Sequence, residues 1–479
     1  MRINNNMSAV ITNNQLLGTE ETLANVMEKL SSGYSINHAS DNPSGIAIAG
    51  KMQAQIEGLA QASTNGSDGI SVLQTAEGAL NEVTDMIQRM RELSVQAANG
   101  TNSISERKTI QKEIDSLLTE IDRVAETTEF NNINLLNGGL DNRTYAEHAT
   151  RMQTSNVVPA GLYQLKINEA ATQGTYGGTS TLLGGADTLS MAGTITINGY
   201  GIELTDGMSR EAVYEAMRDA CENGSAQISD PGENIAIKSV KYGAKADLKI
   251  DFSSKEFAAA LGFDDSLLDE SGSVTTVGTD ADIELYKEGG SVDSMFGAQA
   301  TYHTDGNHII ITDVGGFEFS FMAEVGYQDN TATDPDGTDG MIAFNVTDIG
   351  SMTLHIGANK NQNMEVRIAA VTTQFMYIDD LNVTRVNGPE DALDSLDVAL
   401  SYVTAVRSQL GAYENRLDHT TKSLDTTEEN MTSAISRIED ADMATTMVEY
   451  TKLNVLEQAG TSALAQANEL PQLALQLLQ

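Results

Sequence analysis

The sequence predicts a mixed fold: a long antiparallel α-helical coiled-coil rod formed by both termini, with one or two inserted α+β or β-rich outer domains. Three observations predict it. Apolar residues recur every seven positions near both ends of the chain, as in coiled-coil helices. The middle loses this period and becomes rich in Gly, Thr and Asp, and aromatic residues make up only 5% of the 479 residues.

The N-terminal part, residues 4–128, is expected to be helical with two breaks. The first break lies at residues 40–45, where a proline biases the preceding residue away from the helical region. The second lies at residues 98–102 (ANGTN), after which a further helix should fold back as a hairpin. Between the breaks a seven-residue stripe is formed by Leu59, Gly66, Leu73, Leu80 and Ile87. We expect Gly66 in this stripe, and Gly69 in its companion stripe, to weaken the seam.

The C-terminal part carries the longer seam. It is formed by Leu396, Val403, Leu410, Leu417, Leu424, Met431 and Ile438. At about 1.5 Å rise per residue, the stripe would run on the order of 60 Å. A lone helix would leave such a stripe in water, so it needs a partner helix. The N-terminal seam is the expected partner, which puts both chain ends at one tip of the rod.

The middle of the chain, residues 146–349, is expected to fold separately. Residues 194–204 contain two apolar alternating runs around an Asn-Gly pair, which predicts a β-hairpin. Ser209 is placed to cap a short helix that runs through Cys221. Further strands are expected at 235–240, 248–252, 308–311 and 317–321. After the insertion, residues 352–368 predict a second hairpin.

Composition excludes several classes of function. The formal net charge is −40, from 68 acidic and 28 basic residues, and such a surface repels nucleic acid and anionic membranes. The single cysteine, Cys221, allows no intramolecular disulfide and no cysteine-based metal site. There is no cleavable N-terminal signal pattern and no apolar run long enough to cross a bilayer. None of the six histidines forms an H-E-x-x-H pair, and P-loop and G-x-S-x-G motifs are absent. We therefore expect no enzyme activity, no cofactor and no metal.

Segments at both ends of the chain resemble bacterial flagellins. The similar segments, which follow one another in the order found in that family, are residues 28–33 (EKLSSG), 91–99 (RELSVQAAN), 130–136 (FNNINLL), 354–359 (LHIGAN) and 436–444 (SRIEDADMA). The resemblance implies a structural subunit that self-assembles into the extracellular helical filament of the bacterial flagellum, which drives swimming. It also implies export without a cleaved signal. The partners would be further copies of the chain, the flagellar export apparatus, a secretion chaperone, the filament cap and the hook-junction proteins.

The resemblance also implies a division into domains. Residues 1–45 and 444–479 would pair as the inner coiled coil, and residues 46–145 and 350–443 would form the rod, with a β-hairpin near 352–368. Residues 146–349 would project outward as the variable domain. Two alternatives remain open: a hook–filament junction protein, or a secreted adhesin or enzyme built on the inserted domain.

Two sets of candidate site residues follow. By resemblance, Arg89, Leu93 and Glu113 fall where the family presents its patch for Toll-like receptor five; residues four apart share one face of a helix. The alternative is that Arg89 and Glu113 are solvated charges of the rod surface or contacts between stacked subunits. A second set, the apolar terminal residues expected to form the polymerisation core, consists of Leu16, Leu23, Leu30, Val455, Leu456, Leu464, Leu470, Leu473 and Leu478. These segments have too little intrachain surface to offset their ordering entropy, so their folding should be coupled to packing against neighbouring copies.

Overall fold

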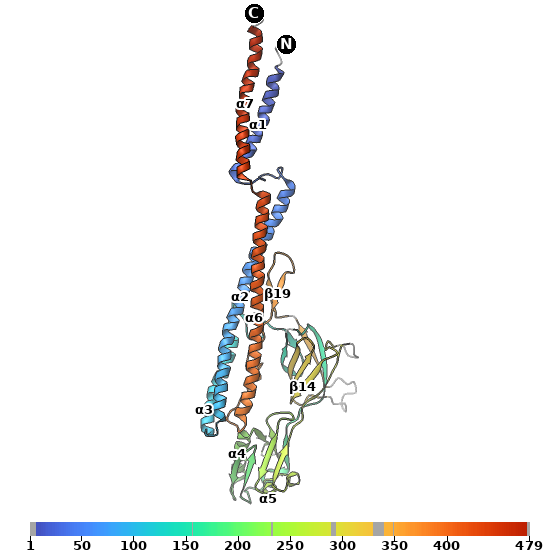
Figure 1. Cartoon of the computed structure of the whole chain (residues 1–479). Helices are drawn as coiled ribbons and strands as arrows, with labels where there is room; N and C mark the ends of the chain where they lie inside the picture. Colours follow the sequence, from blue (N-terminus) through green and yellow to red (C-terminus); the bar gives the residue numbers. More distant parts are fainter. Residues whose placement is uncertain are drawn as a thin grey trace. The chain divides into compact units, whose positions relative to one another are not determined.

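The computed structural model describes residues 6–155, 157–230, 233–288, 294–328, 340–347 and 349–476 (Figure 1). Within these residues the chain divides into two compact units. The first unit contains the residues up to 70, residues 354–364 and the residues from 415 onward. The second unit contains residues 71–353 and 365–414.

Long helices make up the two ends of the chain. They are α1 (Met7–Ser32), α2 (Pro43–Ala98), α3 (Ile104–Thr127), α6 (Gly388–Glu439) and α7 (Met443–Gln476). The breaks between them have local causes. Gly33 ends α1 at a φ of 79°, a left-handed conformation that glycine adopts without steric cost. Pro43 suits the first position of α2, and Ser103 and Glu106 form a capping box at the start of α3. The expected breaks are present.

In the first unit α1 and α7 lie side by side, and the start of α1 is at the same tip as the end of α7 (Figure 1). At that tip the Asn6 side chain donates a hydrogen bond to the Ala467 carbonyl at 2.8 Å. At the other end of the pair, the Ser35 amide donates to the Glu439 carbonyl at 2.6 Å, and the Ala441 amide donates to the Gly33 carbonyl at 2.9 Å. The loops that follow α1 and precede α7 are therefore joined by backbone hydrogen bonds.

In the second unit the seams of α2 and α6 are buried. The buried seam residues there are Leu73, Leu80, Ile87, Leu396, Val403 and Leu410. Polar side chains join the two helices beside the seam: Arg91 donates to Asp397, and Gln74 donates to Glu414, each at 2.7 Å. Here the seven-residue pattern forms the packed interface between helices from opposite ends of the chain.

In the first unit the burial of the α6 seam decreases along the helix. Leu417 is fully buried, whereas Leu424 and Ile438 are half-buried. Ser63 of α2 donates to Asp425 at 2.7 Å, so α2 still accompanies α6 in this region.

Gly66 and Gly69 do not interrupt α2. A Cβ atom added at Gly66 would lie 2.5 Å from Cγ2 of Thr421, and one added at Gly69 would lie 2.5 Å from Cδ1 of Leu354. Neighbouring segments therefore approach the α2 backbone closely where a side chain is missing. Gly66 and Gly69 are therefore positions of close packing, and whether they weaken the seam stays a prediction.

Two short hairpins lie next to the helices. One consists of β1 (Glu129–Phe130) and β2 (Ile133–Asn134), just after α3. The other consists of β18 (Met352–His355) and β19 (Asn363–Val366), which confirms the hairpin expected within residues 352–368.

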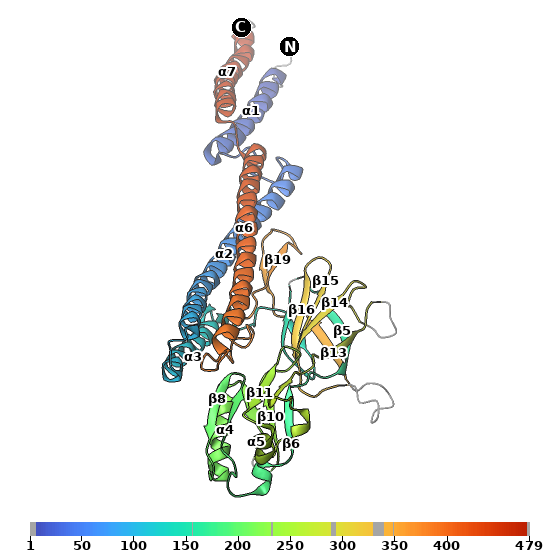
Figure 2. The same cartoon turned by 60° about the horizontal axis from the view of Figure 1, so that its bottom comes forward.

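The described part of the insertion contains two hydrophobic cores (Figure 2). The first, here called the α+β core, combines two helices with the sheets β6-β10-β9 and β12-β11-β7-β8. Its elements are β6 (Thr175–Thr181), the 3-10 turn Leu182–Gly185, β7 (Gly193–Ile197), β8 (Tyr200–Leu204), α4 (Arg210–Asn223), β9 (Ala226–Ile228), β10 (Asn234–Ser239), β11 (Leu248–Phe252), α5 (Lys255–Leu261), the 3-10 turn Asp265–Leu267 and β12 (Ser273–Thr276). The expected hairpin is β7–β8, and Ser209 caps α4 by accepting a hydrogen bond from the Ala212 amide.

The second core, here called the β core, consists of the sheets β13-β5-β17-β3 and β14-β15-β16-β4. Its strands are β3 (Arg143–Tyr145), β4 (Ala149–Thr154), β5 (Gly161–Glu169), β13 (Asp282–Leu285), β14 (Thr301–Asp305), β15 (His308–Asp313), β16 (Phe317–Ala323) and β17 (Met341–Thr347). Aromatic rings fill its interior: the ring centroids of Tyr163 and Phe296 are 5.0 Å apart, and those of Phe319 and Phe344 are 4.8 Å apart. The expected strands at 308–311 and 317–321 correspond to β15 and β16.

The close approach at Gly66 can be tested against another glycine of the same helix. An alanine in a helix is more favourable than a glycine by about 1 kcal/mol. Gly78 is exposed and has nothing within 4 Å of an added Cβ atom, so Gly78→Ala should raise the free energy of unfolding by about that amount. Gly66→Ala has to displace Thr421 and should gain nothing or lose stability. Urea unfolding of both variants measures the difference, and an equal gain at the two positions would show that the contact is loose.

Candidate assembly and recognition surfaces

Helix α7 keeps an apolar face exposed to solvent. Val448, Val455 and Leu456 are 71%, 61% and 47% exposed. They belong to an open groove of about 510 Å³ lined by Met447, Val448, Thr451, Lys452, Val455 and Leu456. These residues come in pairs four positions apart, which places them on one face of the helix. We call this set the α7 face.

Helix α1 carries exposed apolar residues as well. They are Met7, Val10, Ile11, Leu17 and Met27. Two helices can cover only one side of each other, and the remaining apolar residues of both stay in water. The α1–α7 pair alone therefore leaves apolar surface of both helices exposed to water. A large exposed apolar patch on a protein surface usually marks an interaction site.

The structure places the described polymerisation residues in two different environments. Leu16, Leu23, Leu30 and Leu464 are half-buried, and Val455 and Leu456 are exposed. The side chains of Leu470 and Leu473, and Leu478 as a whole, lie outside the described residues. A Cβ atom added at Gly460 would lie 3.2 Å from Cδ1 of Leu16, so α1 and α7 are in close contact there.

Sequence reasoning missed two residues that are buried in this helix pair, Val26 and Ala467. The large leucines are the stronger apolar signal in the sequence, but α1 and α7 pack closely enough to bury smaller side chains. A small residue on an amphipathic helix was the available signal, and it is weak because alanine is common on exposed faces as well.

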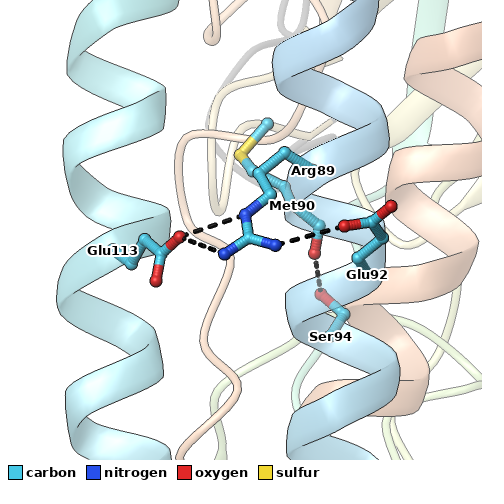
Figure 3. A network of polar contacts seen from close by, with 5 residues as sticks. All are labelled: Arg89, Met90, Glu92, Ser94 and Glu113. Carbon is cyan, nitrogen blue, oxygen red and sulfur yellow. Dashed lines mark hydrogen bonds and ion pairs between the residues drawn. The ribbon is translucent and has the colours of Figure 1, made fainter.

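A second candidate surface lies where α2 and α3 are adjacent, around Arg89 (Figure 3). The Arg89 side chain donates from Nε and Nη2 to Oε1 of Glu113 at 3.1 and 2.8 Å. Its Nη1 donates to Oε2 of Glu92 at 3.2 Å. Hydrogen bonding to Glu113, and then to Glu92, raises the pKa of Arg89. All three side chains are about half-exposed or more, so the cluster is a solvated ion-pair surface.

Leu93 does not belong to that surface. It is 2% exposed and lies in the core of the rod, so it offers almost no area to a receptor. Four residues advance a helix by about 40° beyond one full turn. This rotation is enough to separate a surface residue from a buried one, because α2 packs against other helices on more than one side. The structure thus brings Arg89 and Glu113 together across α2 and α3 and keeps Leu93 apart, where we expected Leu93 to share one face of its helix with Arg89.

The β18–β19 hairpin forms a third surface in the first unit. The Asn65 side chain donates to the His355 carbonyl at 2.9 Å, and the Asn359 amide donates to the Gln362 side chain at 2.8 Å. A Cβ atom added at Gly58 would lie 3.0 Å from Cβ of Ala358. A groove of about 420 Å³ remains beside the hairpin, lined by Gln55, Leu59, Ile356, Gly357, Ala358, Asn359, Gln362, Asn363, Leu424, Thr427 and Met431.

Among the described residues, no three His, Cys, Asp or Glu side chains are grouped so that they could hold a metal ion. Burial raises the pKa of the Cys221 thiol to about 12, so this group is not a ready nucleophile. No helix in the described part of the chain has both the length and the apolar character of a membrane span.

Comparisons with known proteins agree with the resemblance seen in the sequence. Residues 3–140 match the family described as the bacterial flagellin N-terminal helical region, and residues 393–478 match the bacterial flagellin C-terminal helical region. A flagellin of Salmonella choleraesuis is 32% identical, with 99% of each chain covered. Flagellin D of Vibrio anguillarum is 30% identical, with 100% of this chain and 99% of that protein covered. A solved structure of FliC from Burkholderia pseudomallei covers 73% of this chain and 99% of its own, at 17% identity and a TM-score of 0.23, which is too low to support an argument.

The different environments of Leu93 and Arg89 predict different effects of substitution. Leu93→Ala removes a buried side chain and should cost about 2–5 kcal/mol of the free energy of unfolding. Arg89→Ala breaks exposed ion pairs and should change stability by about 1 kcal/mol or less. Urea denaturation of the two variants at the same pH and salt concentration makes the comparison. A loss for Leu93→Ala as small as that for Arg89→Ala would mean that Leu93 is not a core residue in solution.

Proposed function

The chain belongs to the bacterial flagellin family, and from this premise we propose that it polymerises by burying the exposed apolar faces of α1 and α7 against other copies of itself. Family membership makes the chain a structural subunit of the flagellar filament. Our proposal concerns how the subunit assembles. The observation that carries it is the α7 face, which holds four large apolar side chains in solvent: Met447, Val448, Val455 and Leu456.

A second copy of the chain is the occupant that fits this face best. Burying one Val or Leu side chain is worth about 1.5–3 kcal/mol, so a face with several such residues favours association strongly. Every copy carries the same α1 and α7 residues, and a repeated contact between unlike faces of identical subunits builds a helical filament. Each subunit also brings a formal charge of −40, so assembly requires salt to screen the repulsion between copies.

The same reasoning applies to the free subunit. The α1–α7 pair buries few residues, and the ordering entropy of two helices is large. We propose that these segments are weakly ordered before assembly and gain their full stability inside the filament.

The α7 face can be tested by substitution. Val448→Ser combined with Val455→Ser should raise the critical concentration for polymerisation by about a hundredfold or more, because each of the two lost burials weakens the contact by about 1.4 kcal/mol or more. Sedimentation of filaments grown from seeds at fixed salt gives the critical concentration. Val314→Ser is the matched control, since Val314 is 76% exposed and lies in the turn between β15 and β16 of the β core. Normal polymerisation of the double variant would refute the role of this face.

The remaining partners are proposals that rest on family membership. The subunit is expected to leave the cell through the flagellar export apparatus with the help of a secretion chaperone, and to meet the filament cap and the hook-junction proteins outside. Identity to flagellins over nearly the full chain favours a filament subunit over the alternative of a junction protein. An adhesive role of residues 146–349 remains a separate hypothesis.

A second candidate function is recognition by Toll-like receptor five in a host. The specific observation in its favour is the half-exposed Arg89–Glu113 pair, which offers a guanidinium group on the rod surface. Arginine is over-represented among the residues that contribute most to protein interfaces. In this form the proposed patch consists of Arg89 and Glu113, and Leu93 acts only by supporting the helix.

Receptor recognition predicts that Arg89→Ala lowers signalling in receptor-expressing cells by about tenfold or more, which corresponds to the loss of about 1.4 kcal/mol or more of binding free energy. Arg123→Ala is the matched control, because Arg123 pairs with Glu120 on the exposed surface of α3. Monomeric protein should be used for both variants. Equal signalling by the two would remove Arg89 from the proposed patch.

A further inference from the structure

The segment between β19 and α6, residues 367–387, is fixed to helix α3; we call it the strap. The Thr373 amide and hydroxyl donate to the two carboxylate oxygens of Asp122, at 2.8 and 2.7 Å. Further along, the Gln111 side chain donates to the Leu381 carbonyl at 2.8 Å and accepts from the Val383 amide at 2.7 Å. The strap is therefore part of the helical framework of the second unit.

The β core is attached to the strap by a polar clamp. Arg151 of β4 forms a bidentate ion pair with Asp379, at 2.9 and 2.7 Å, and the two side chains are only 28% and 26% exposed. Gln153 donates to the Phe375 carbonyl. The Tyr377 hydroxyl donates to the Arg151 carbonyl at 3.0 Å. Burial raises the pKa of Tyr377 to about 12, so this donor keeps its proton over the physiological range.

The two central residues of the clamp have unusual backbones. Arg151 has a φ of 53° and Tyr377 a φ of 56°, in the left-handed region that side chains other than glycine rarely adopt. Each is held by a contact with the other, since the Tyr377 hydroxyl binds the Arg151 backbone and the guanidinium lies 5.7 Å from the centroid of the Tyr377 ring. Loss of the contact would let both backbones relax, so the clamp should open as a unit.

His308 of β15 packs against this clamp. Its ring centroid is 4.4 Å from that of Tyr377, and its Nε2 atom is buried without a hydrogen-bond partner in the described residues. The charged and titratable groups that face it are Arg151 on β4, Tyr377 on the strap, and His303 and Asp305 on β14. A protonated ring would bury a second cation near Arg151 and leave its Nε2–H group without an acceptor.

We propose that His308 is a pH-sensitive latch: the neutral ring lets the Arg151–Asp379 clamp hold the β core on the strap, and protonation of the ring releases it. Histidine is the side chain whose charge ordinarily changes between pH 5 and 8. Supporting this, burial lowers the pKa of His308 below its usual 6.5, with Asp305 opposing and His303 and Arg151 adding to the effect. A lowered pKa means that the docked state binds the proton less well than the released state. Docking is therefore at full strength above about pH 6.5 and weakens as the pH falls below that value.

The test uses hydrogen exchange of the full-length protein, read on peptides that cover residues 372–381 and 149–154. After correction for the intrinsic effect of pH on exchange, protection in the wild type should fall by about tenfold between about pH 8 and about pH 5.5, because the released state binds the proton more tightly than the docked state. This range stays above the pH at which aspartates ordinarily titrate. In H308Q the protection should equal that of the wild type at the higher pH and should not fall at the lower one.

Three further variants make the outcome decisive. H303Q removes the exposed neighbouring histidine on β14 and should keep the wild-type pH response. D379N breaks the clamp directly and should be unprotected at both pH values. H308F keeps a ring against Tyr377 without a titratable group, so it replaces H308Q if that variant loses protection at the higher pH through poor packing. A wild type without a pH response, or an H308F variant that retains one, would overturn the proposal.

Discussion

The buried seam between α2 and α6 is the constraint on which the rest of the second unit depends. These helices come from opposite ends of the chain, and packing them antiparallel brings residues close to both ends of the insertion to the same region of the rod. The first and last strands of the insertion are then able to pair: Thr144 of β3 lies opposite Val346 of β17. The β core therefore begins and ends within one sheet, and its attachment to the helices follows from the seam.

The burial of apolar residues decreases along the C-terminal half of the chain. We infer that the segments with well-buried residues are stable in the free subunit and that the segments with exposed apolar residues are not. Leu396 and Val403 lie in a complete interface, whereas Leu424 and Ile438 are half-buried and Val448 is exposed. Local stability in a protein follows the density of buried contacts. The part of the chain with the fewest such contacts is also the part whose apolar residues remain available to other copies. In our proposal, low stability of the free ends and the capacity to polymerise thus have the same cause.

The seven-residue pattern, the two helix breaks and the hairpin at residues 352–368 could be predicted because each depends on residues close together in the sequence. Strands β10, β11, β15 and β16 could be predicted for the same reason. Strands β5 and β17 were not, since they pair with each other across most of the insertion and no local signal carries that information. The close approach of Thr421 to Gly66 and the burial of Leu93 could not be predicted, because both depend on which neighbouring segment covers a given face of α2. Residues four positions apart on a helix differ in direction by about 40°. That difference is enough to place one of them on the surface and the other in the core.

The distribution of charge connects the attachment of the insertion with the assembly of subunits. With 28 basic residues against 68 acidic ones, cations are scarce, and several of them join segments far apart in the chain. Arg91 joins α2 to α6, Arg151 joins the β core to the strap, and Lys241 joins the α+β core to the start of α6. One-to-one pairing with the 28 basic residues would leave at least 40 of the 68 acidic residues without a basic partner (68 − 28 = 40). This charge balance supports our proposal that contacts between subunits rely mainly on apolar burial, which is the property that the α7 face supplies.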